Sequence, residues 1–373
     1  MTRQRALVLL IGIGAVLAVG GYAGPRSGLL VAIGIGFGLT LEGLRFGFAG
    51  PWRMAAHNRD MRGLLAQLVA IGLTAAVALP LLAAHPTELS GAHGPIGIAM
   101  IGGAFVFGVC MQIVAGCGSG TLVNAGSGNL GGAAALIPFA AGSFLATLHL
   151  GWWTDLGSLP VLTVSDVAGQ GLALPLTLAG LVVIAVVAVA LSERGKRMPP
   201  VRLWVAAGLL ALLALANLAV AGQPWGVVYG LGLWGAKVAQ AGGMDVAATA
   251  FWSAPGNAER LAQSVLLDVT SLTNIGILLG AYLVMRWRAD VSPQVAQMRP
   301  AAWLAIVVAG LMLGYSSRLA FGCNVGAFFS GISTGSLHGW VWFPTAFLGS
   351  MLGGWLRPRL LAQAGPAPAV RPA

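Results

Sequence analysis

Charged side chains are scarce in this sequence: only 8% of its 373 residues are Asp, Glu, Lys or Arg. A soluble domain is charged at about a quarter of its positions. Hydrophobic residues make up 57% of the chain. A chain with so few polar side chains cannot cover a water-soluble fold, which excludes soluble enzymes and soluble binding modules. The lipid bilayer is therefore the solvent to consider.

Cysteine is also scarce. The three cysteines never form a C-x-x-C pair, and their odd number argues against the disulfide framework of a secreted protein. The five histidines lack the spacing of a metal site. The sequence contains neither a Walker motif nor the glycine fingerprint of a dinucleotide site. We therefore expect no metal, no cofactor, no ATP-driven engine and no enzymatic activity.

Acidic residues number only ten against twenty basic ones, which gives a net charge of +10. The basic residues form short clusters between apolar stretches and no continuous basic face, so we expect no nucleic-acid partner. Basic residues in short loops stay in the cytoplasm, which predicts a multi-pass protein of the bacterial cytoplasmic (inner) membrane with both termini inside. The basic connections contain Arg53, Arg59, Arg62, Arg194, Lys196, Arg197, Arg202, Arg286, Arg288, Arg299, Arg357 and Arg359.

Ten apolar segments approach the length of about 20 residues that a helix needs to cross a bilayer. They predict an all-α polytopic membrane protein with about nine to ten transmembrane helices. The segments are 6–23, 28–44, 63–84, 96–114, 130–148, 173–193, 204–221, 264–285, 301–317 and 338–356.

Four glycine-rich intervals lie between these segments, at 45–60, 115–129, 222–262 and 318–336. Each is too polar or too broken to span the bilayer, and too apolar to be a simple solvated loop. Irregular backbone is stable at membrane depth only where protein or a water-filled cavity surrounds it. We therefore expect parts of these intervals to be re-entrant hairpins that line a central path.

Two of the intervals carry the same pattern, G-x8-C-x-x-G. Its residues are Gly108, Cys117 and Gly120 in the first copy and Gly314, Cys323 and Gly326 in the second. The orientation rule makes the two preceding segments cross the membrane in opposite directions, which predicts an inverted repeat with its site near the midplane. The predicted parts are an additional transmembrane helix (1–27), a first repeat (28–148), a linker with a connecting helix (149–203), a second repeat (204–356) and a cytoplasmic tail (357–373).

Cys117 and Cys323 are the main candidates for chemistry. A thiol is a soft group with a weak S–H donor, and backbone N–H groups at short helix starts bind oxyanions. Buried cysteines more often act as small packing residues, but the repeat favours a functional role. The flanking residues that we include in the candidate transport site are Gly116, Gly118, Gly120, Gly322, Asn324 and Gly326.

Three further candidates are open to two interpretations. Cys110 lies two helical turns before Cys117 and could equally take part in transport or in packing. Arg318 and Lys237 are basic residues in apolar stretches; such residues are functional by default in membranes, but both could instead extend to the interface. Glu42 and Arg45 are spaced for a structural ion pair on one helical turn.

The cysteine-containing stretches, Gly102 to Leu130 and Leu313 to Ser336, resemble the signature blocks of the YeeE/YedE family of sulfur transporters. The stretch Pro224 to Lys237 also contributes to this resemblance, which extends over about residues 28–356. It implies uptake of thiosulfate or a related sulfur oxyanion, with Cys117 and Cys323 carrying the ion, and a small cytoplasmic sulfur-carrier protein of the TusA type as a partner. The family commonly has a further cysteine in its first hairpin, where this chain has Gly47.

Two other functions are compatible with the same residues. A membrane-bound thiol oxidoreductase or sulfurtransferase would use Cys117 and Cys323 through a persulfide or disulfide intermediate. The inverted repeat argues against it, because it would start the two thiols on opposite sides of the midplane. A structural subunit would instead show a sealed core without anion flux.

Overall fold

The computed structural model describes residues 3–288 and 298–361. It is an all-α polytopic membrane protein, as predicted, and a long helix lies in each of the ten predicted segments. The predicted cytoplasmic tail lies outside the described residues from residue 362 onwards. The long helices are α1 (Arg3–Ala23), α2 (Pro25–Gly43), α4 (Arg62–Ala84), α5 (Ile98–Val114), α7 (Leu130–Asp155), α9 (Gln170–Leu191), α10 (Val201–Ala221), α14 (Val269–Arg288), α15 (Pro300–Leu319) and α16 (Leu337–Leu360).

Within the described ranges, eight helical stretches are long and apolar enough to cross a membrane. The stretch that contains α5 continues into α6 (Gly118–Gly126), and the stretch that contains α15 continues into the π-helix η2 (Asn324–Gly331). The remaining long helices, α2 and α16, each include charged residues within their bounds.

Short helices occupy the four glycine-rich intervals. The first interval contains α3 (Ala49–Asn58), the second contains α6, and the fourth contains η2. The third contains α11 (Val228–Ala241), α12 (Ala250–Ser253) and α13 (Pro255–Ala262). The 3-10 turn η1 (Val265–Leu267), the helix α8 (Val164–Ala168) and an antiparallel pair of strands, β1 (Pro95–Gly97) and β2 (Ser158–Val161), complete the described fold.

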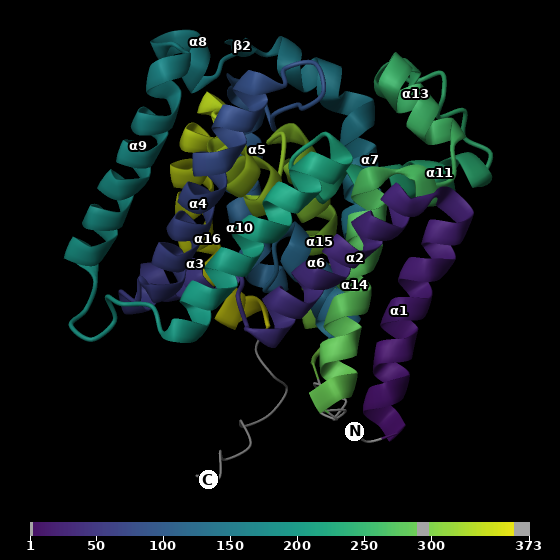
Figure 1. The fold of residues 1–373 in the computed structure, drawn as a ribbon, viewed down its shortest axis with the longest axis horizontal. Helices are drawn as coiled ribbons and strands as arrows, with labels where there is room; N and C mark the ends of the chain where they lie inside the picture. The colour runs from purple at the N-terminus through teal and green to yellow at the C-terminus, as the bar shows by residue number, and fades with distance from the viewer. Residues whose placement is uncertain (1–2, 289–297, 362–373) are drawn as a thin grey trace.

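Different connections lie at the two ends of the bundle (Figure 1). The connection between α9 and α10, which contains Arg194 and Lys196, lies at the end of the molecule where α1 begins, whereas α8, β2 and α13 lie at the opposite end. We call these ends the basic face and the opposite face. The basic face is the side that the positive-inside rule assigns to the cytoplasm.

Helix pairs that are equivalent in the two predicted repeats pack in the same way. Helix α5 packs on α16 as α15 packs on α7, and α10 packs on α4 as α2 packs on α14. The glycine contacts repeat in the same register. A Cβ on Gly108 would overlap the carbonyl oxygen of Ala346, and a Cβ on Gly314 would overlap that of Phe139.

The other two helices of these pairs contribute equivalent glycines. A Cβ on Gly349 would overlap the carbonyl oxygen of Phe105, and a Cβ on Gly142 would overlap that of Leu311. Small residues at such positions let helix backbones approach closely in a membrane. This pattern supports the inverted repeat, and its exact boundaries stay a prediction. Helix α6 contacts α7 and α14, and η2 contacts α16 and α4.

Candidate functional site

The two cysteines of the repeat begin two short helices that meet in the protein interior. Cys117 is the N-cap of α6, and Cys323 is the N-cap of η2. Both side chains are buried, with 1% and 0% exposure. A Cβ on Gly118 would lie 2.9 Å from the Sγ atom of Cys323. The structure therefore brings the second thiol against the residue that follows the first, closer together than the sequence argument about opposite sides of the midplane indicated.

A sharp turn of the same design precedes each cysteine. Ala115, the residue after α5, has φ 62°, and Phe321, two residues after the end of α15, has φ 54°. Each left-handed residue is followed by a glycine in close contact with the next helix: a Cβ on Gly116 would lie 2.9 Å from the nitrogen of Thr121, and one on Gly322 would lie 2.6 Å from that of Ala327. Larger residues would displace these turns, and Gly322 also has φ 152°, a conformation that favours glycine.

Backbone N–H groups surround both sulfur atoms. Those of Ser119 and Gly120 face the Sγ atom of Cys117, and those of Val325 and Gly326 face that of Cys323. The Ser119 hydroxyl also lies 3.4 Å from the Cys117 sulfur. The N-terminus of a helix carries partial positive charge and exposed N–H donors. Each thiol therefore lies at a place that favours an anion.

Gly120 and Gly326 leave space beside these donors. Both residues are partly exposed. A Cβ on Gly120 would only touch the Cys117 sulfur, at 3.7 Å, and a Cβ on Gly326 would have no atom within 4 Å. Atoms of a small ligand can therefore come close to the backbone at these two positions.

A cavity of about 380 Å³ connects Cys117 with the basic face. Its lining includes Cys117, Ser119, Asn124, Gly47 and Arg45. A neighbouring cavity of about 460 Å³ shares Arg45 and Asn124 with the first. Its lining also contains Glu42, Arg288 and Arg357, so cationic side chains outnumber the carboxylate. This mouth favours small anions over cations.

Glu42 does not form the predicted ion pair with Arg45. In the described part of the chain, its carboxylate lies 3.8 Å from Arg288 instead. The reason is that α2 ends at Gly43, so Arg45 lies beyond the helix with φ 49°. Arg45 is thus directed to the two cavities.

Gly47 lies in the cavity wall at the place where the family commonly has cysteine. A Cβ there would have no atom within 4 Å, so the position has room for a side chain. The amide of Gln67 holds this loop by donating to the Gly47 carbonyl oxygen at 2.8 Å. The corresponding loop before α11 is held in the same way, since the Asn274 amide donates to the Val227 carbonyl oxygen at 2.9 Å.

Asn324 is a fully buried amide that follows Cys323. Within the described residues, neither its Oδ1 nor its Nδ2 atom has a hydrogen-bond partner. A buried amide without partners costs free energy. An unpaired amide beside the two thiols can hydrogen-bond a ligand.

The Arg318 side chain is directed into the protein. Its Nη2 atom donates to the Ser143 hydroxyl and to the Val228 carbonyl oxygen, both at 3.3 Å, and its buried Nε atom has no hydrogen-bond partner among the described residues. The guanidinium lies over the rings of Tyr229 and Phe251 at 5.5 and 5.3 Å. Arg318 is thus fixed between α7 and α11, on the opposite-face side of Cys323.

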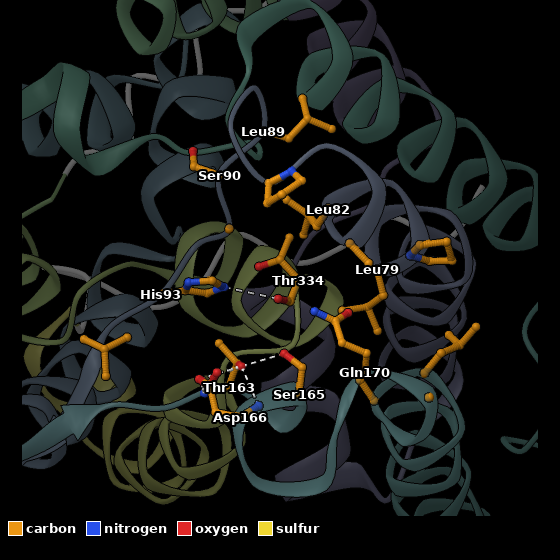
Figure 2. Close-up of a pocket in the computed structure, with 18 of the residues that line it drawn as sticks. Leu79, Leu82, Leu89, Ser90, His93, Thr163, Ser165, Asp166, Gln170 and Thr334 are labelled. Atoms are coloured by element: carbon orange, nitrogen blue, oxygen red, sulfur yellow. Dashed lines mark hydrogen bonds between the residues drawn. The ribbon is translucent and has the colours of Figure 1, made fainter.

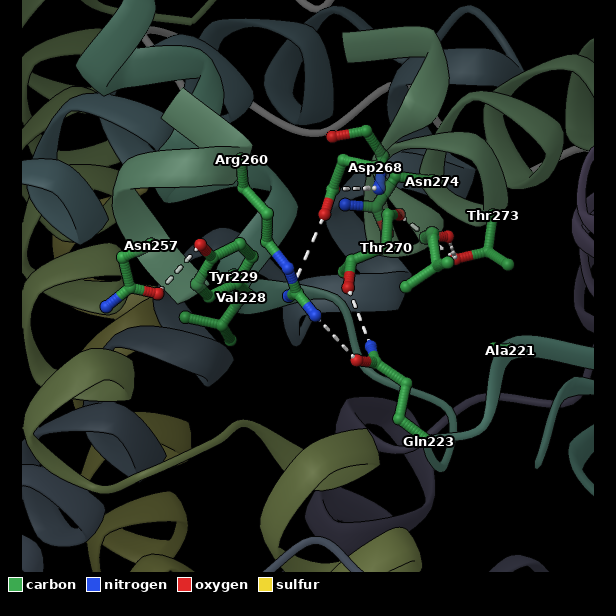
Figure 3. A network of polar contacts seen from close by, with 12 residues as sticks. Ala221, Gln223, Val228, Tyr229, Asn257, Arg260, Asp268, Thr270, Thr273 and Asn274 are labelled. Atoms are coloured by element: carbon green, nitrogen blue, oxygen red, sulfur yellow. Dashed lines mark hydrogen bonds and ion pairs between the residues drawn. The ribbon is translucent and has the colours of Figure 1, made fainter. Parts of the chain in front are cut away.

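Figure 3 shows a polar network around Arg260 and Tyr229, which the sequence did not predict. The Arg260 guanidinium lies 4.9 Å from the Tyr229 ring and 3.8 Å from the Asp268 carboxylate, and it donates to the Gln223 side chain at 3.1 Å. Tyr229 donates to the Asn257 side chain at 2.9 Å. Asn257 and Arg260 belong to α13, but their partners Tyr229, Gln223 and Asp268 lie on other segments, so spacing gives no signal for the network.

We call the place where Gly118 meets the Cys323 sulfur the thiol junction. The two remaining sequence candidates lie apart from it. Lys237 donates to the carbonyl oxygens of Leu261 and Gln263 at 2.7 and 2.6 Å, which is a structural cap at the end of α13. Cys110 is buried on α5 within the hydrophobic core. Its place agrees with packing, and its part in transport stays a prediction.

A third cavity, of about 1000 Å³, opens at the opposite face (Figure 2). Its lining includes His93, Asp166 and Thr334, and His93 lies 3.3 Å from the Thr334 carbonyl oxygen. Hydrogen bonds from Thr163 lower the pKa of the Asp166 carboxyl. Thr334 follows η2, so this cavity adjoins the chain segment that contains Cys323.

Comparison with known proteins gives the family. The sulphur transport family matches residues 44–352. The probable transporters YedE of Escherichia coli and Salmonella typhimurium are each 27% identical to this chain, over 154 and 149 residues. These matches cover 41% and 40% of this chain but only 36% and 35% of the two relatives.

A third relative aligns over nearly its whole length. The thiosulfate transporter TsuA of Spirochaeta thermophila is 24% identical over 350 residues, which cover 88% of this chain and 96% of that protein. The family region contains both cysteine turns and most of the wall of the 380 Å³ cavity, from Arg45 to Asn124. The chain belongs to the sulphur transport family, in agreement with the resemblance of its cysteine blocks to YeeE/YedE proteins.

Proposed function

We propose that this protein takes up thiosulfate or a related sulfur-containing anion across the bacterial cytoplasmic membrane, along a central path past Cys323 and Cys117. One observation carries the proposal. Two thiols begin two helices that meet in the interior, each among backbone N–H groups, and a cavity reaches Cys117 from the basic face. The name of the TsuA relative supports thiosulfate as the substrate.

The junction suits a sulfur oxyanion in two ways. Helix-start N–H groups and the unpaired Asn324 amide are donors for oxyanion oxygens. The two thiols are soft groups that donate weak S–H hydrogen bonds to a terminal sulfur atom. No covalent bond forms or breaks in this step. Weak contacts also let the ion leave, which transport requires.

The cationic side chains at the basic face favour movement of an anion from Cys117 towards that face. Arg45, Arg288 and Arg357 line the cavities at the basic face together with a single carboxylate, Glu42. An anion released at Cys117 therefore enters an electropositive mouth. A small sulfur-carrier protein of the TusA type would take up the ion at this face.

Uptake of labelled thiosulfate into membrane vesicles tests the proposal. Cys117→Ala and Cys323→Ala should each abolish most of the uptake at a normal protein level, and Gly208→Ala, where a Cβ has no atom within 4 Å, is the control. Cys110→Ala tests whether the third thiol takes part. Sulfite, sulfate and selenium analogues added as competitors define the substrate. Undiminished uptake in both Cys117→Ala and Cys323→Ala would reject the cysteine path.

The proximity of Cys323 to Gly118 also favours a second candidate, a thiol oxidoreductase or sulfurtransferase. A sulfurtransferase moves the sulfane sulfur of thiosulfate to a thiol, which forms a persulfide, adds the mass of one sulfur atom and releases sulfite. A thiol oxidoreductase passes two electrons and two protons from Cys117 and Cys323 to a disulfide substrate, which is reduced to two thiols, and the protein loses the mass of two hydrogens. Mass spectrometry of the intact protein after exposure to thiosulfate distinguishes the two. Unmodified thiols in a protein that transports support the carrier, and a covalent intermediate that turns over supports the enzyme.

A further inference from the structure

Helices α1 and α2 form a narrow wedge. They cross closely near the opposite face, where a Cβ on Gly28 would lie 3.0 Å from the Cα atom of Gly20 and from the Val16 carbonyl oxygen. Towards the basic face they separate, and α14 forms the third wall. The space between the three helices is an apolar groove of about 630 Å³, which we call the wedge groove. Its lining includes Val8, Gly12, Leu17, Ala32, Ile35 and Leu283.

The length of the wedge groove matches one leaflet. The lining residues on α1 run from Val8 to Leu17, a distance of about 14 Å at 1.5 Å per residue. The hydrocarbon core of a bilayer is about 30 Å thick. The groove therefore covers about half of the core, on the basic-face side of the Gly20 crossing.

The mouth of the wedge groove combines an aromatic ring with cations. Trp287 and Arg288 line it, and the Arg5 guanidinium lies over the Trp287 ring at 5.0 Å. Arg288 donates to the Gly43 carbonyl oxygen at 2.7 Å and lies 3.8 Å from the Glu42 carboxylate. Two guanidinium groups against one carboxylate leave a net positive charge. Tryptophan and arginine are typical anchors at the level of lipid headgroups.

We propose that the wedge groove is a binding site for an anionic phospholipid of the basic-face leaflet. One acyl chain lies between α1, α2 and α14, and the phosphate lies beside Arg5 and Arg288. Basic residues near a membrane surface attract anionic lipids. Because α1 and α2 both precede residue 44, where the family match begins, two of the three walls belong to this chain and not to the matched family region. The site does not depend on the proposed transport function.

Native mass spectrometry tests this site. The full chain, purified in detergent and stripped of lipid, is titrated with phosphatidylglycerol or phosphatidylcholine of the same acyl chains. We expect one phosphatidylglycerol to be retained in preference to phosphatidylcholine. Replacing Arg288 by Gln should reduce this preference about fivefold, and the double variant with Arg5→Gln should reduce it further. Glycerol phosphate, which has no acyl chain, should not compete.

The second test fills the wedge groove with a larger side chain. Ala32→Phe puts a ring into the groove and should remove the retained lipid, whereas Ala179→Phe, on the exposed side of α9, should leave it in place. The elution profile and melting temperature show whether each variant is folded; if Ala32→Phe is not, the two arginine variants decide. Equal retention of both lipids, or unchanged retention in folded Ala32→Phe or in the double arginine variant, would overturn the proposal.

Discussion

Gly118 gives the sharpest test of the thiol junction, because it directly follows Cys117 and lies against the Cys323 sulfur. A Cβ there would lie 2.9 Å from the Cys323 sulfur and 3.3 Å from the Cγ1 atom of Val227. The first distance is shorter than an ordinary contact of carbon with sulfur. Gly118→Ala therefore has to displace the Cys323 side chain or the start of α6. We expect the protein to fold and its uptake of thiosulfate to fall.

The magnitude follows from packing. An extra methyl group in a close-packed interior costs about 1–3 kcal/mol. Alanine is the better helix former by at most about 1 kcal/mol, which offsets part of this cost. If the cost falls on the conformation that binds the anion, the rate of uptake decreases about fivefold to a hundredfold, since 1.4 kcal/mol corresponds to a factor of ten.

The assay compares initial rates of labelled thiosulfate uptake in vesicles with equal amounts of folded protein. Gly208→Ala is the matched control, because Gly208 lies within α10 and a Cβ there has no atom within 4 Å. Uptake by Gly208→Ala should equal that of the natural protein. A Gly118→Ala protein that transports at the natural rate would refute the argument, since the junction would then have room that the structure does not show.

Three further predictions concern other parts of the path. Gly47→Cys should fold normally, because its Cβ meets no atom within 4 Å, and a small thiol reagent should label it from the basic face. Asn324→Leu should retain the fold, because the amide loses no partner in residues 3–288 and 298–361, while thiosulfate uptake falls by about tenfold or more, as expected for a lost hydrogen bond to a charged group. Gly314→Ala should lower the stability by about 1–3 kcal/mol in thermal unfolding, because the new Cβ overlaps the Phe139 carbonyl oxygen.

The long helices could be predicted from the sequence because length and hydropathy alone define a membrane-spanning helix. Their ends were harder to place. The predicted segment 264–285 begins instead at Val269, since η1 precedes it and the Asp268 carboxylate accepts a hydrogen bond from the backbone nitrogen of Ser271. The residues Ser264–Leu267 are largely apolar, and nothing in their composition indicates this turn.

The candidate site was predictable only in part. The internal repeat indicates that Cys117 and Cys323 are equivalent, but no spacing shows that the second sulfur lies against Gly118. Arg318 gave an ambiguous signal, because its partners Ser143 and Tyr229 belong to α7 and α11, far away in the sequence. Contacts of this kind depend on how helices pack, and a single sequence does not encode them in a local pattern.

The two thiols differ in access, although they are equivalent in the repeat, and this difference predicts an order of reaction. Cys117 lines the cavity at the basic face, whereas Cys323 is completely buried behind Gly118. The close glycine contacts of the long helices oppose large movements there, so access to Cys323 requires movement of the short elements. In a Cys110→Ala background, a small charged thiol reagent applied from the basic face should label Cys117 first, and thiosulfate should slow this labelling. Faster labelling of Cys323 from that face would contradict the inference that the 380 Å³ cavity gives access to Cys117.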